Sequence, residues 1–177
     1  MDRLTQLSRQ AIVHEKIARK AGGVCDFYVD GKRLVFDAEI LHIAALKILE
    51  VAYGRGVTHI GGEESSSLPL IGAILTLSQF KGKPLCGFMI RRKLKDYGKS
   101  SWIEGSVTQG DKVIVVDDIT GTGFTGQRCC QLLIQAGIQV QAYMSIVDRN
   151  EGAAEKLKEL GIELQSLVQI VEIDKGI

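Results

Sequence analysis

One stretch decides the fold of this 177-residue chain: Val113-Ile114-Val115-Val116-Asp117-Asp118-Ile119-Thr120-Gly121-Thr122-Gly123-Phe124-Thr125. It begins with a continuous β-branched run, which is typical of a strand buried on both faces and therefore of a parallel sheet. Two adjacent carboxylates and a turn rich in glycine and threonine follow, and residues 127–136 then have the composition of a helix. The stretch predicts a strand, a tight turn and a helix in immediate succession.

The turn in this stretch has the chemistry of an anion site. At the start of a helix, backbone N–H groups lack partners and the helix dipole is positive, so both favour an anion there. Asp117 and Asp118 would repel a phosphate unless a metal ion or ligand hydroxyl groups lay between them. We therefore expect a phosphorylated, hydroxyl-rich ligand accompanied by Mg²⁺. A polar turn with a capping threonine and no ligand is the alternative.

A dinucleotide site is a further alternative, because residues 121–126 also match G-x-G-x-x-G. The dinucleotide version needs an acidic residue at the end of the next strand, roughly 20 residues on. Asp148 ends the next apolar run but lies somewhat too far along, and the pair Asp117 and Asp118 would repel a pyrophosphate. A phosphorylated, hydroxyl-rich ligand is therefore favoured over the cofactor of a dinucleotide-binding oxidoreductase.

In this segment the chain resembles the type I phosphoribosyltransferases. Their signature is a hydrophobic strand, two acidic residues, two spacers and a loop that contains threonine and glycine. Asp117 and Asp118 match the acidic pair, which in the family faces the ribose hydroxyl groups of phosphoribosyl pyrophosphate. The resemblance implies that both are catalytic and contact Mg²⁺ indirectly, through substrate or water. The loop that binds the 5-phosphate corresponds to Ile119, Thr120, Gly121, Thr122, Gly123, Phe124 and Thr125.

Strands and helices are expected to alternate along the rest of the chain. Apolar patterns predict helices over residues 4–18, 38–53 and 151–160, and a further helix that begins at Pro69. They predict two short strands, over residues 25–29 and 33–36, on either side of a turn at Asp30-Gly31. Further strands are predicted over residues 57–60, 85–90, 139–147 and 164–173. Such alternation implies a parallel sheet with ligands at the carboxyl ends of its strands.

We expect one α/β domain over residues 1–177. Its core, over residues 38–177, is predicted to be a central, mostly parallel sheet flanked by helices, as in the type I phosphoribosyltransferase fold. A small N-terminal hood, built from a helix and a hairpin, is predicted over about residues 1–37.

Three further segments follow strand ends and are expected at the same edge of the sheet. The first contains Ser65, Ser66 and Ser67 ahead of Pro69. Hydroxyl and backbone N–H groups at a helix start suit a pyrophosphate, and the family's pyrophosphate loop occupies the same position. A capping loop without a ligand is the alternative.

The second segment is the basic run Arg91-Arg92-Lys93-Leu94-Lys95-Asp96-Tyr97-Gly98-Lys99. Its composition alone also fits a solvated loop. The run resembles the mobile loop of orotate phosphoribosyltransferases, Arg-Lys-x-x-Lys-Asp-His-Gly, which closes over the neighbouring subunit's site. The resemblance implies that four residues bind phosphoribosyl pyrophosphate: Arg91, Arg92, Lys95 and Tyr97. It further implies a homodimer, in which Lys95 aids the departure of pyrophosphate. Tyr97 replaces a histidine, and its phenol, with a pKa of about 10, can still donate a hydrogen bond.

The third segment contains Arg149, which follows an apolar run. A similarly placed Asp-Arg-x-x-Gly segment supplies an arginine to the pyrimidine in orotate phosphoribosyltransferases, and the planar guanidinium of Arg149 suits a carboxylate. Gly121 lies where those enzymes have a threonine near the base, and Val29 replaces a lysine that contacts substrates. The resemblance implies Mg²⁺-dependent transfer of phosphoribosyl to orotate, giving orotidine monophosphate and pyrophosphate. The alternatives are transfer to another nucleobase and a phosphoribosyl-pyrophosphate-sensing regulator with little catalysis.

Composition narrows the class of partner. A content of 45% hydrophobic and 24% charged residues describes an ordinary globular protein, and a net charge of +1 gives no reason to expect nucleic acid or a membrane surface as a partner. Charged residues interrupt the longest apolar stretch, and residues 1–6 lack a signal-peptide pattern, so we expect a cytoplasmic protein. The cysteines and histidines show no metal-ligand spacing, which leaves Mg²⁺ as the expected cofactor.

Overall fold

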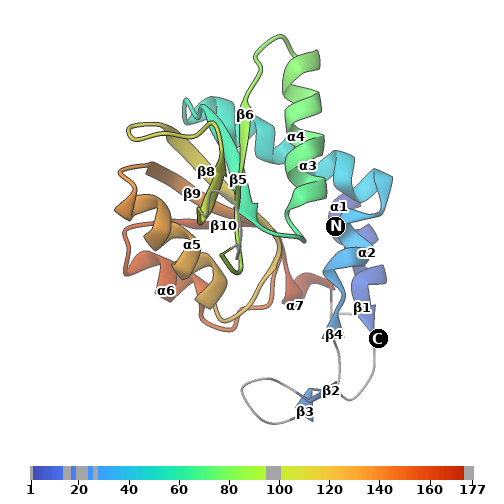
Figure 1. The fold of residues 1–177 in the computed structure, drawn as a ribbon. Coiled ribbons are helices and arrows are strands. Elements are labelled where there is room, and N and C mark those ends of the chain that lie inside the picture. The colour runs from blue at the N-terminus through green and yellow to red at the C-terminus, as the bar shows by residue number, and fades with distance from the viewer. Residues whose placement is uncertain (1, 14–16, 19–23, 26–27, 95–100, 174–177) are drawn as a thin grey trace.

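A six-stranded sheet with the order β10-β9-β8-β5-β6-β7 forms the centre of the computed structural model (Figure 1), which describes residues 2–13, 17–18, 24–25, 28–94 and 101–173. The strands are β5 (His59–Glu63), β6 (Cys86–Ile90), β7 (Ile103–Gly105), β8 (Lys112–Thr120), β9 (Gln139–Asp148) and β10 (Leu164–Gln169). Neighbouring strands pair in parallel except β7, which is antiparallel to β6. The prediction of a mostly parallel sheet is confirmed.

Helices cover both faces of this sheet. The helices α3 (Ala38–Gly54) and α4 (Leu68–Phe80) pack on one face, and α5 (Phe124–Gln135) and α6 (Ala153–Lys158) on the other. Strand β8 contributes to both hydrophobic clusters, Ile114 and Val116 to that of α3 and α4, Val113 and Val115 to that of α5. Because side chains alternate along a strand, the side chain of Asp117 lies on the α5 face.

Local capping explains why the two predicted helices on the first face form. Asp37 caps α3 by accepting hydrogen bonds from the N–H groups of Glu39 and Ile40. Pro69 stands in the first turn of α4, where its missing N–H group has no partner to lose. Among the helices that the structure describes, none combines the length and hydropathy that a membrane span requires.

The N-terminal part differs from the prediction. The helix expected over residues 4–18 is wrong, because α1 (Arg3–Ser8) and the short helix η1 (Arg9–Ala11) give way to strands β1 (Ile12–Val13), β2 (Ile17–Ala18), β3 (Val24–Cys25) and β4 (Tyr28–Val29). β1 pairs with β4, so that Ile12 lies opposite Val29, and both side chains are buried in the cluster of α3 and α4. This burial outweighs the helical spacing of the sequence.

Two further strand predictions are corrected. Residues 33–36 belong to or adjoin helix α2 (Gly31–Val35), because the Asp30 carboxylate accepts the N–H of Lys32 and caps a helix where the sequence had predicted a hairpin turn. The strand expected over residues 164–173 is β10 followed by the short helix α7 (Ile170–Ile173).

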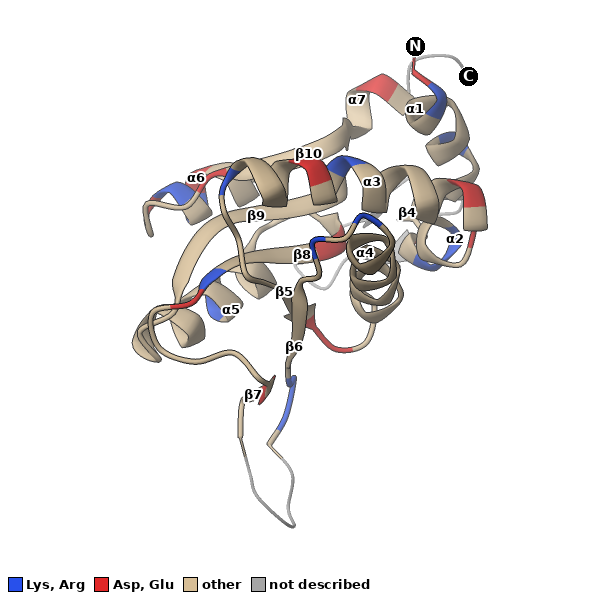
Figure 2. Ribbon diagram, turned by 90° about the horizontal axis from the view of Figure 1, so that it is seen from above, with Lys and Arg blue, Asp and Glu red and all other residues tan. Residues whose placement is uncertain are grey.

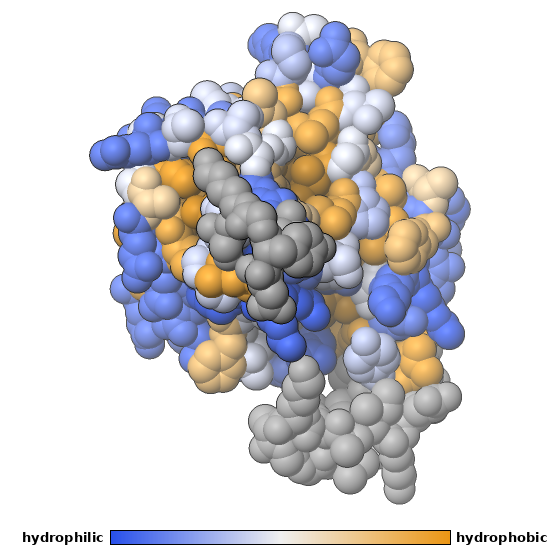
Figure 3. All heavy atoms as spheres, viewed as in Figure 1, coloured by the Kyte–Doolittle hydropathy of each residue, from blue (hydrophilic) through white to orange (hydrophobic). Residues whose placement is uncertain are grey.

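Two surface features lie near the sheet: basic residues after β6 and exposed hydrophobic residues of α4. In Figure 2, basic residues follow β6 at the start of its connection to β7. In Figure 3, hydrophobic residues gather beside α4, where Leu68 and Phe80 are 39% and 84% exposed.

Candidate active site

The carboxyl ends of the parallel strands bring the four predicted segments to one edge of the sheet. Glu63 at the end of β5 pairs with Ile90 at the end of β6. Asp117 pairs with Ser145, and Thr120 with Asp148, at the ends of β8 and β9. The serine segment, the basic run, the acidic pair and the segment of Arg149 therefore begin next to one another.

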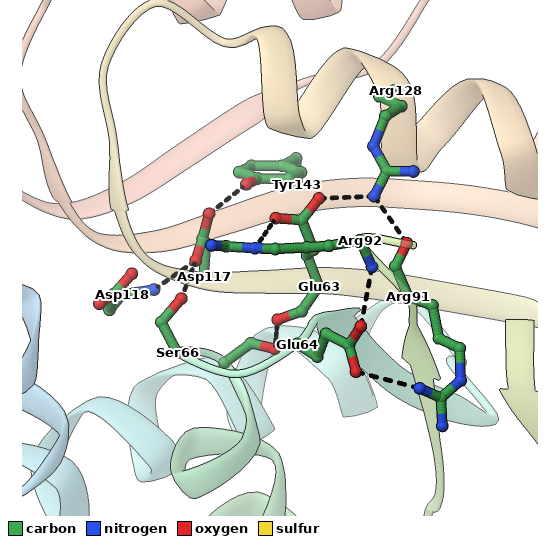
Figure 4. A network of polar contacts seen from close by, with 10 residues as sticks. Glu63, Glu64, Ser66, Arg91, Arg92, Asp117, Asp118, Arg128 and Tyr143 are labelled. Carbon is green, nitrogen blue, oxygen red and sulfur yellow. Dashed lines mark hydrogen bonds and ion pairs between the residues drawn. The ribbon is translucent and has the colours of Figure 1, made fainter. Parts of the chain in front are cut away.

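Asp117 is a buried carboxylate at this edge, with 8% of its surface exposed. Its Oδ2 accepts a 2.8 Å hydrogen bond from the buried hydroxyl of Tyr143, and its Oδ1 accepts one of 3.0 Å from the N–H of Asp118. The hydroxyl of Ser66 donates a longer bond of 3.4 Å to the same Oδ1 (Figure 4). Both oxygens of Asp117 are thus held by groups of the protein.

The pKa values of Asp117 and of its partner Tyr143 are both raised at this site. Burial raises the pKa of Asp117 well above its usual value, and the negative charge of Asp118 raises it further, while the Tyr143 hydrogen bond opposes the shift. Burial, together with the charge of Asp117, also raises the pKa of Tyr143, so its hydroxyl remains a donor. A cation or ligand hydroxyl groups would favour the charged form of the pair.

Asp118 lies against helix α2. Its Oδ1 accepts the N–H of Ile119 at 2.8 Å. A Cβ atom added at Gly31, the first residue of α2, would lie 2.0 Å from Asp118 Oδ2, so only glycine fits there without a shift. Helix α2 therefore lies directly against the acidic pair.

The loop after the acidic pair has the backbone geometry of an anion site. Gly123 caps α5 with φ +78°, a left-handed conformation that favours glycine, and a Cβ there would lie 2.7 Å from the Cα of Ala153. The N–H of Gln127 donates to the carbonyl of Gly123, which leaves the N–H groups of residues 124–126 without helical partners. Such a helix start favours a phosphate.

A cavity of about 170 Å³ joins these parts. It is lined by Asp117, Ile119, Thr120, Gly121, Thr122, Gly123, Phe124, Thr125, Gly126, Tyr143 and Arg149. Every residue predicted for the phosphate loop is in this lining, whereas Asp118 is not. A larger, open depression of about 480 Å³ lies beside Phe36 and touches none of these residues.

In the serine segment, the side chain of Ser66 contacts the acidic pair. Ser66 faces Asp117, whereas the hydroxyl of the buried Ser67 donates to the carbonyl of Glu63 at 2.6 Å. Ser65 is exposed, and the peptide bond that precedes it is cis. Ser67 is the N-cap residue of α4, but its side chain makes no capping hydrogen bond.

The two arginines at the start of the basic run point in different directions (Figure 4). Arg91 makes a bidentate pair with Glu104, at 2.6 and 3.1 Å, and is 3.5 Å from Glu64. Arg92 extends toward Asp117, and its Nε donates to Glu63 Oε2 at 2.7 Å. The predicted residues Lys95 and Tyr97 lie outside the described part of the chain.

Arg149 lies flat against Gly121. A Cβ at Gly121 would lie 2.5 Å from Arg149 Nη2, which donates to Glu151 at 2.8 Å. The Nε of Arg149 is buried and has no hydrogen-bond partner. Arg149 lines the cavity, and a buried donor without a partner is unfavourable unless an acceptor is supplied.

The donor set fits a magnesium ion that arrives with its ligand. Among the described residues, no three His, Cys, Asp or Glu side chains cluster to hold a metal. Mg²⁺ commonly keeps several waters and binds through one or two carboxylates and substrate phosphates. The two acids, Asp117 and Asp118, match that requirement.

Three residues of this site were not predicted as functional: Glu63, Arg128 and Tyr143. Glu63 is adjacent to the serine segment, and only its contacts with two arginines show its importance. Tyr143 is the one phenol in the apolar run of residues 139–147, and this run was predicted to be a strand. The pairing register of β8 and β9 was needed to bring its hydroxyl to Asp117.

Comparison with known proteins gives consistent likenesses. A family model, the phosphoribosyl transferase domain, matches residues 35–169. An orotate phosphoribosyltransferase of Bradyrhizobium sp. (strain ORS 278) is 32% identical over 170 residues, which cover 94% of this chain and 92% of that protein. The orotate phosphoribosyltransferase of Pyrococcus furiosus is 32% identical over 155 residues, 86% and 82% of the two chains. The crystal structure of Mycobacterium tuberculosis H37Rv orotate phosphoribosyltransferase superposes with a TM-score of 0.81 and 26% identity over 97% of both chains.

Proposed function

Because the chain belongs to the phosphoribosyl transferase domain family, and is therefore a phosphoribosyltransferase, we propose that it transfers phosphoribosyl from phosphoribosyl pyrophosphate to orotate, giving orotidine monophosphate and pyrophosphate. The family and the fold predicted from the sequence are confirmed by these likenesses. The names of the relatives support orotate as the acceptor. The observation that carries the proposal is the single cavity lined by Asp117, the loop over residues 119–126 and Arg149.

The acidic pair is proposed to hold the ribose. As pyrophosphate leaves the anomeric carbon, positive charge develops on the sugar ring, so positioning and electrostatic stabilisation carry the rate. Asp117 would take its charged form when ribose hydroxyl groups donate to the pair, and Asp118 would accept from the neighbouring hydroxyl. The burial of Asp117 and its fixed hydrogen bonds support this role.

The loop over residues 119–125 is proposed to bind the 5-phosphate. The free N–H groups at the start of α5 and the hydroxyl groups of Thr122 and Thr125 would be its donors. The left-handed turn at Gly123 immediately precedes these N–H groups, which supports the assignment.

The serine segment and the basic run are proposed to bind the diphosphate. Ser66 contacts Asp117 and Arg92 extends toward it, which supports this position. Ser65, Ser67, Arg91, Lys95 and Tyr97 are included through the resemblance. A magnesium ion bound with the diphosphate would neutralise negative charge on the leaving group, with Asp117 and Asp118 as its protein contacts through substrate or water.

Arg149 and Gly121 are proposed to form the base site. The unpaired Nε of Arg149 supports a carbonyl or carboxylate acceptor, as orotate provides. Val29, in the place of a lysine, is 2% exposed and belongs to the hydrophobic core, so it offers no charge to the base. This observation keeps transfer to another nucleobase, or a sensing role with little catalysis, as the second candidate.

Assembly and location follow from the same resemblance. We propose a cytoplasmic homodimer in which the loop that contains Lys95 is shared across the subunits, and in which residues 1–37 form a hood over the core. The exposed apolar side chains beside α4 support a contact with a second copy (Figure 3). Light scattering coupled to size-exclusion chromatography would measure the mass.

The decisive experiment incubates the protein with phosphoribosyl pyrophosphate, Mg²⁺ and a panel of nucleobases and measures pyrophosphate release. Release with orotate is the expected result. Release with another base alone would contradict the choice of orotate, and binding of phosphoribosyl pyrophosphate without release would favour the sensing role. The variant Asp118→Asn serves as a control for release by a contaminating enzyme.

A further inference from the structure

The Glu63 carboxylate is held between two arginines. It ends β5, and 9% of its side chain is exposed. Its Oε2 accepts from Arg92 Nε at 2.7 Å and its Oε1 from Arg128 Nη2 at 2.6 Å (Figure 4). A carboxylate buried to this degree needs an opposite charge, so at least one of the two arginines must stay with it.

The two arginines differ in how firmly they are fixed. Arg128 projects from helix α5, also donates to the carbonyl of Arg91 at 2.9 Å, and has its guanidinium 5.6 Å from the ring centre of Trp102. Arg92 belongs to the basic run, and its side chain is 64% exposed against 35% for Arg128. Of the two partners, Arg92 is therefore the one that can leave Glu63 at low free-energy cost.

The position of this cluster connects it to the diphosphate. Glu63 directly precedes the segment that contains Ser66, whose hydroxyl contacts Asp117. Arg92 extends from Glu63 toward the same acid (Figure 4). A diphosphate bound here would present several negative charges to Arg92, in competition with the one carboxylate of Glu63.

We propose that Glu63 and Arg128 set the affinity of this site for the diphosphate of its substrate, provided that the protein binds phosphoribosyl pyrophosphate as proposed. Glu63 pairs with Arg92 while the site is empty. When the diphosphate binds, Arg92 turns to it, and Arg128 remains as the counter-ion of Glu63. Arg128 is thus a positioning residue that acts through Glu63.

Neutralising Glu63 tests the competition. In Glu63→Gln, Arg92 no longer leaves a carboxylate, and a negative charge near the diphosphate is removed. Calorimetric titration with phosphoribosyl pyrophosphate and Mg²⁺, without a nucleobase, should show about two- to fivefold tighter binding, the size expected for a partly exposed ion pair. Unchanged or weaker binding by a folded variant would overturn the proposal.

Removing Arg128 tests the second half of the proposal. In Arg128→Gln, Arg92 is the remaining counter-ion of Glu63 and is held more strongly, so binding should weaken by about two- to fivefold. In the double variant Glu63→Gln/Arg128→Gln this loss should disappear, because Arg128 acts through Glu63. A loss that persists in full would overturn the relay. Should Glu63→Gln fail to fold, unchanged binding by Arg128→Gln would suffice to overturn it.

A matched control neutralises another carboxylate whose side chain pairs with an arginine. The side chain of Glu163 pairs with Arg55 just before β10 and is 57% exposed, and Glu163→Gln should bind phosphoribosyl pyrophosphate as the wild type does. A wild-type protein that binds no phosphoribosyl pyrophosphate would refute the proposed function and this proposal together. Normal wild-type binding with no change in Glu63→Gln would refute this proposal alone.

Discussion

Tyr143 and Asp117, 26 positions apart in the sequence, are joined by a 2.8 Å hydrogen bond that the fully buried phenol donates to Oδ2 of the acid. The phenol ring also packs on Gly126, where a Cβ would lie 2.9 Å from it. The acid is therefore oriented from within the sheet, whereas its other oxygen faces the serine segment.

Replacing Tyr143 by Phe should weaken both stability and activity. The unsatisfied Asp117 oxygen should lower the free energy of unfolding by about 1–3 kcal/mol. The kcat/KM should fall about tenfold, equivalent to about 1.4 kcal/mol. Because the hydrogen bond lowers the pKa of Asp117, its loss should move the acid limb of the pH–rate profile to higher pH. A profile that does not move would show that Tyr143 has only a packing role.

The charge of Asp117 should reduce stability as the pH rises. Its pKa is raised in the folded protein, so its contribution to stability is fully present below the ordinary aspartate pKa of about 3.9 and is lost as the pH rises through the raised value. Asp117→Asn should therefore raise the Tm at neutral pH and flatten its pH dependence, while turnover falls roughly 10²–10³-fold. Thermal unfolding measured across pH tests this, and an unchanged pH dependence would contradict it.

Gly31→Ala should displace the carboxylate of Asp118, because Gly31 in helix α2 lies against it. The added Cβ would meet Asp118 Oδ2, so the carboxylate or α2 must move. We expect kcat/KM to fall by about tenfold or more, since misplacing a catalytic group by about 1 Å is costly. Gly54→Ala is the matched control, because a Cβ there meets nothing within 4 Å. Equal activity of both variants would show that Asp118 tolerates the shift.

Arg149→Met should raise the KM for orotate more than the KM for phosphoribosyl pyrophosphate. Removing a charge-assisted hydrogen bond costs about 1.5–3 kcal/mol, roughly 10- to 150-fold in binding. Steady-state kinetics with each substrate varied in turn measures the difference. Equal increases in both KM values would contradict the assignment of Arg149 to the base site and would indicate a role in binding phosphoribosyl pyrophosphate.

Lys95→Ala should lower turnover by roughly 10²–10³-fold and leave the fold intact, since it removes a charge that stabilises the leaving group. Circular dichroism checks the fold, and single-turnover kinetics checks the chemical step. Near-normal turnover would refute the role that the resemblance assigns to Lys95.

Much of the fold was predictable because its signals are local. The apolar run of β8, the glycine turn and α5 are consecutive in the chain, and Asp37 and Pro69 mark the starts of α3 and α4. Because strands that alternate with helices form a parallel sheet, the segments that follow the strands were expected at one edge of that sheet. The N-terminal part was not predictable in this way, because Ile12 leaves the helical spacing to pair with Val29, a contact between strands that the sequence does not specify.

The sequence by itself determined where the acidic pair and the proposed phosphate loop lie, since Asp117, Asp118 and residues 119–125 are contiguous and the proposed chemistry depends on their order. Only the tertiary structure decided which group orients the carboxylate of Asp117 and which group neutralises that of Glu63. Tyr143 reaches Asp117 across 26 positions and Arg128 reaches Glu63 across 65. Such contacts depend on strand register and helix packing, where a slip of one residue turns a side chain to the other face.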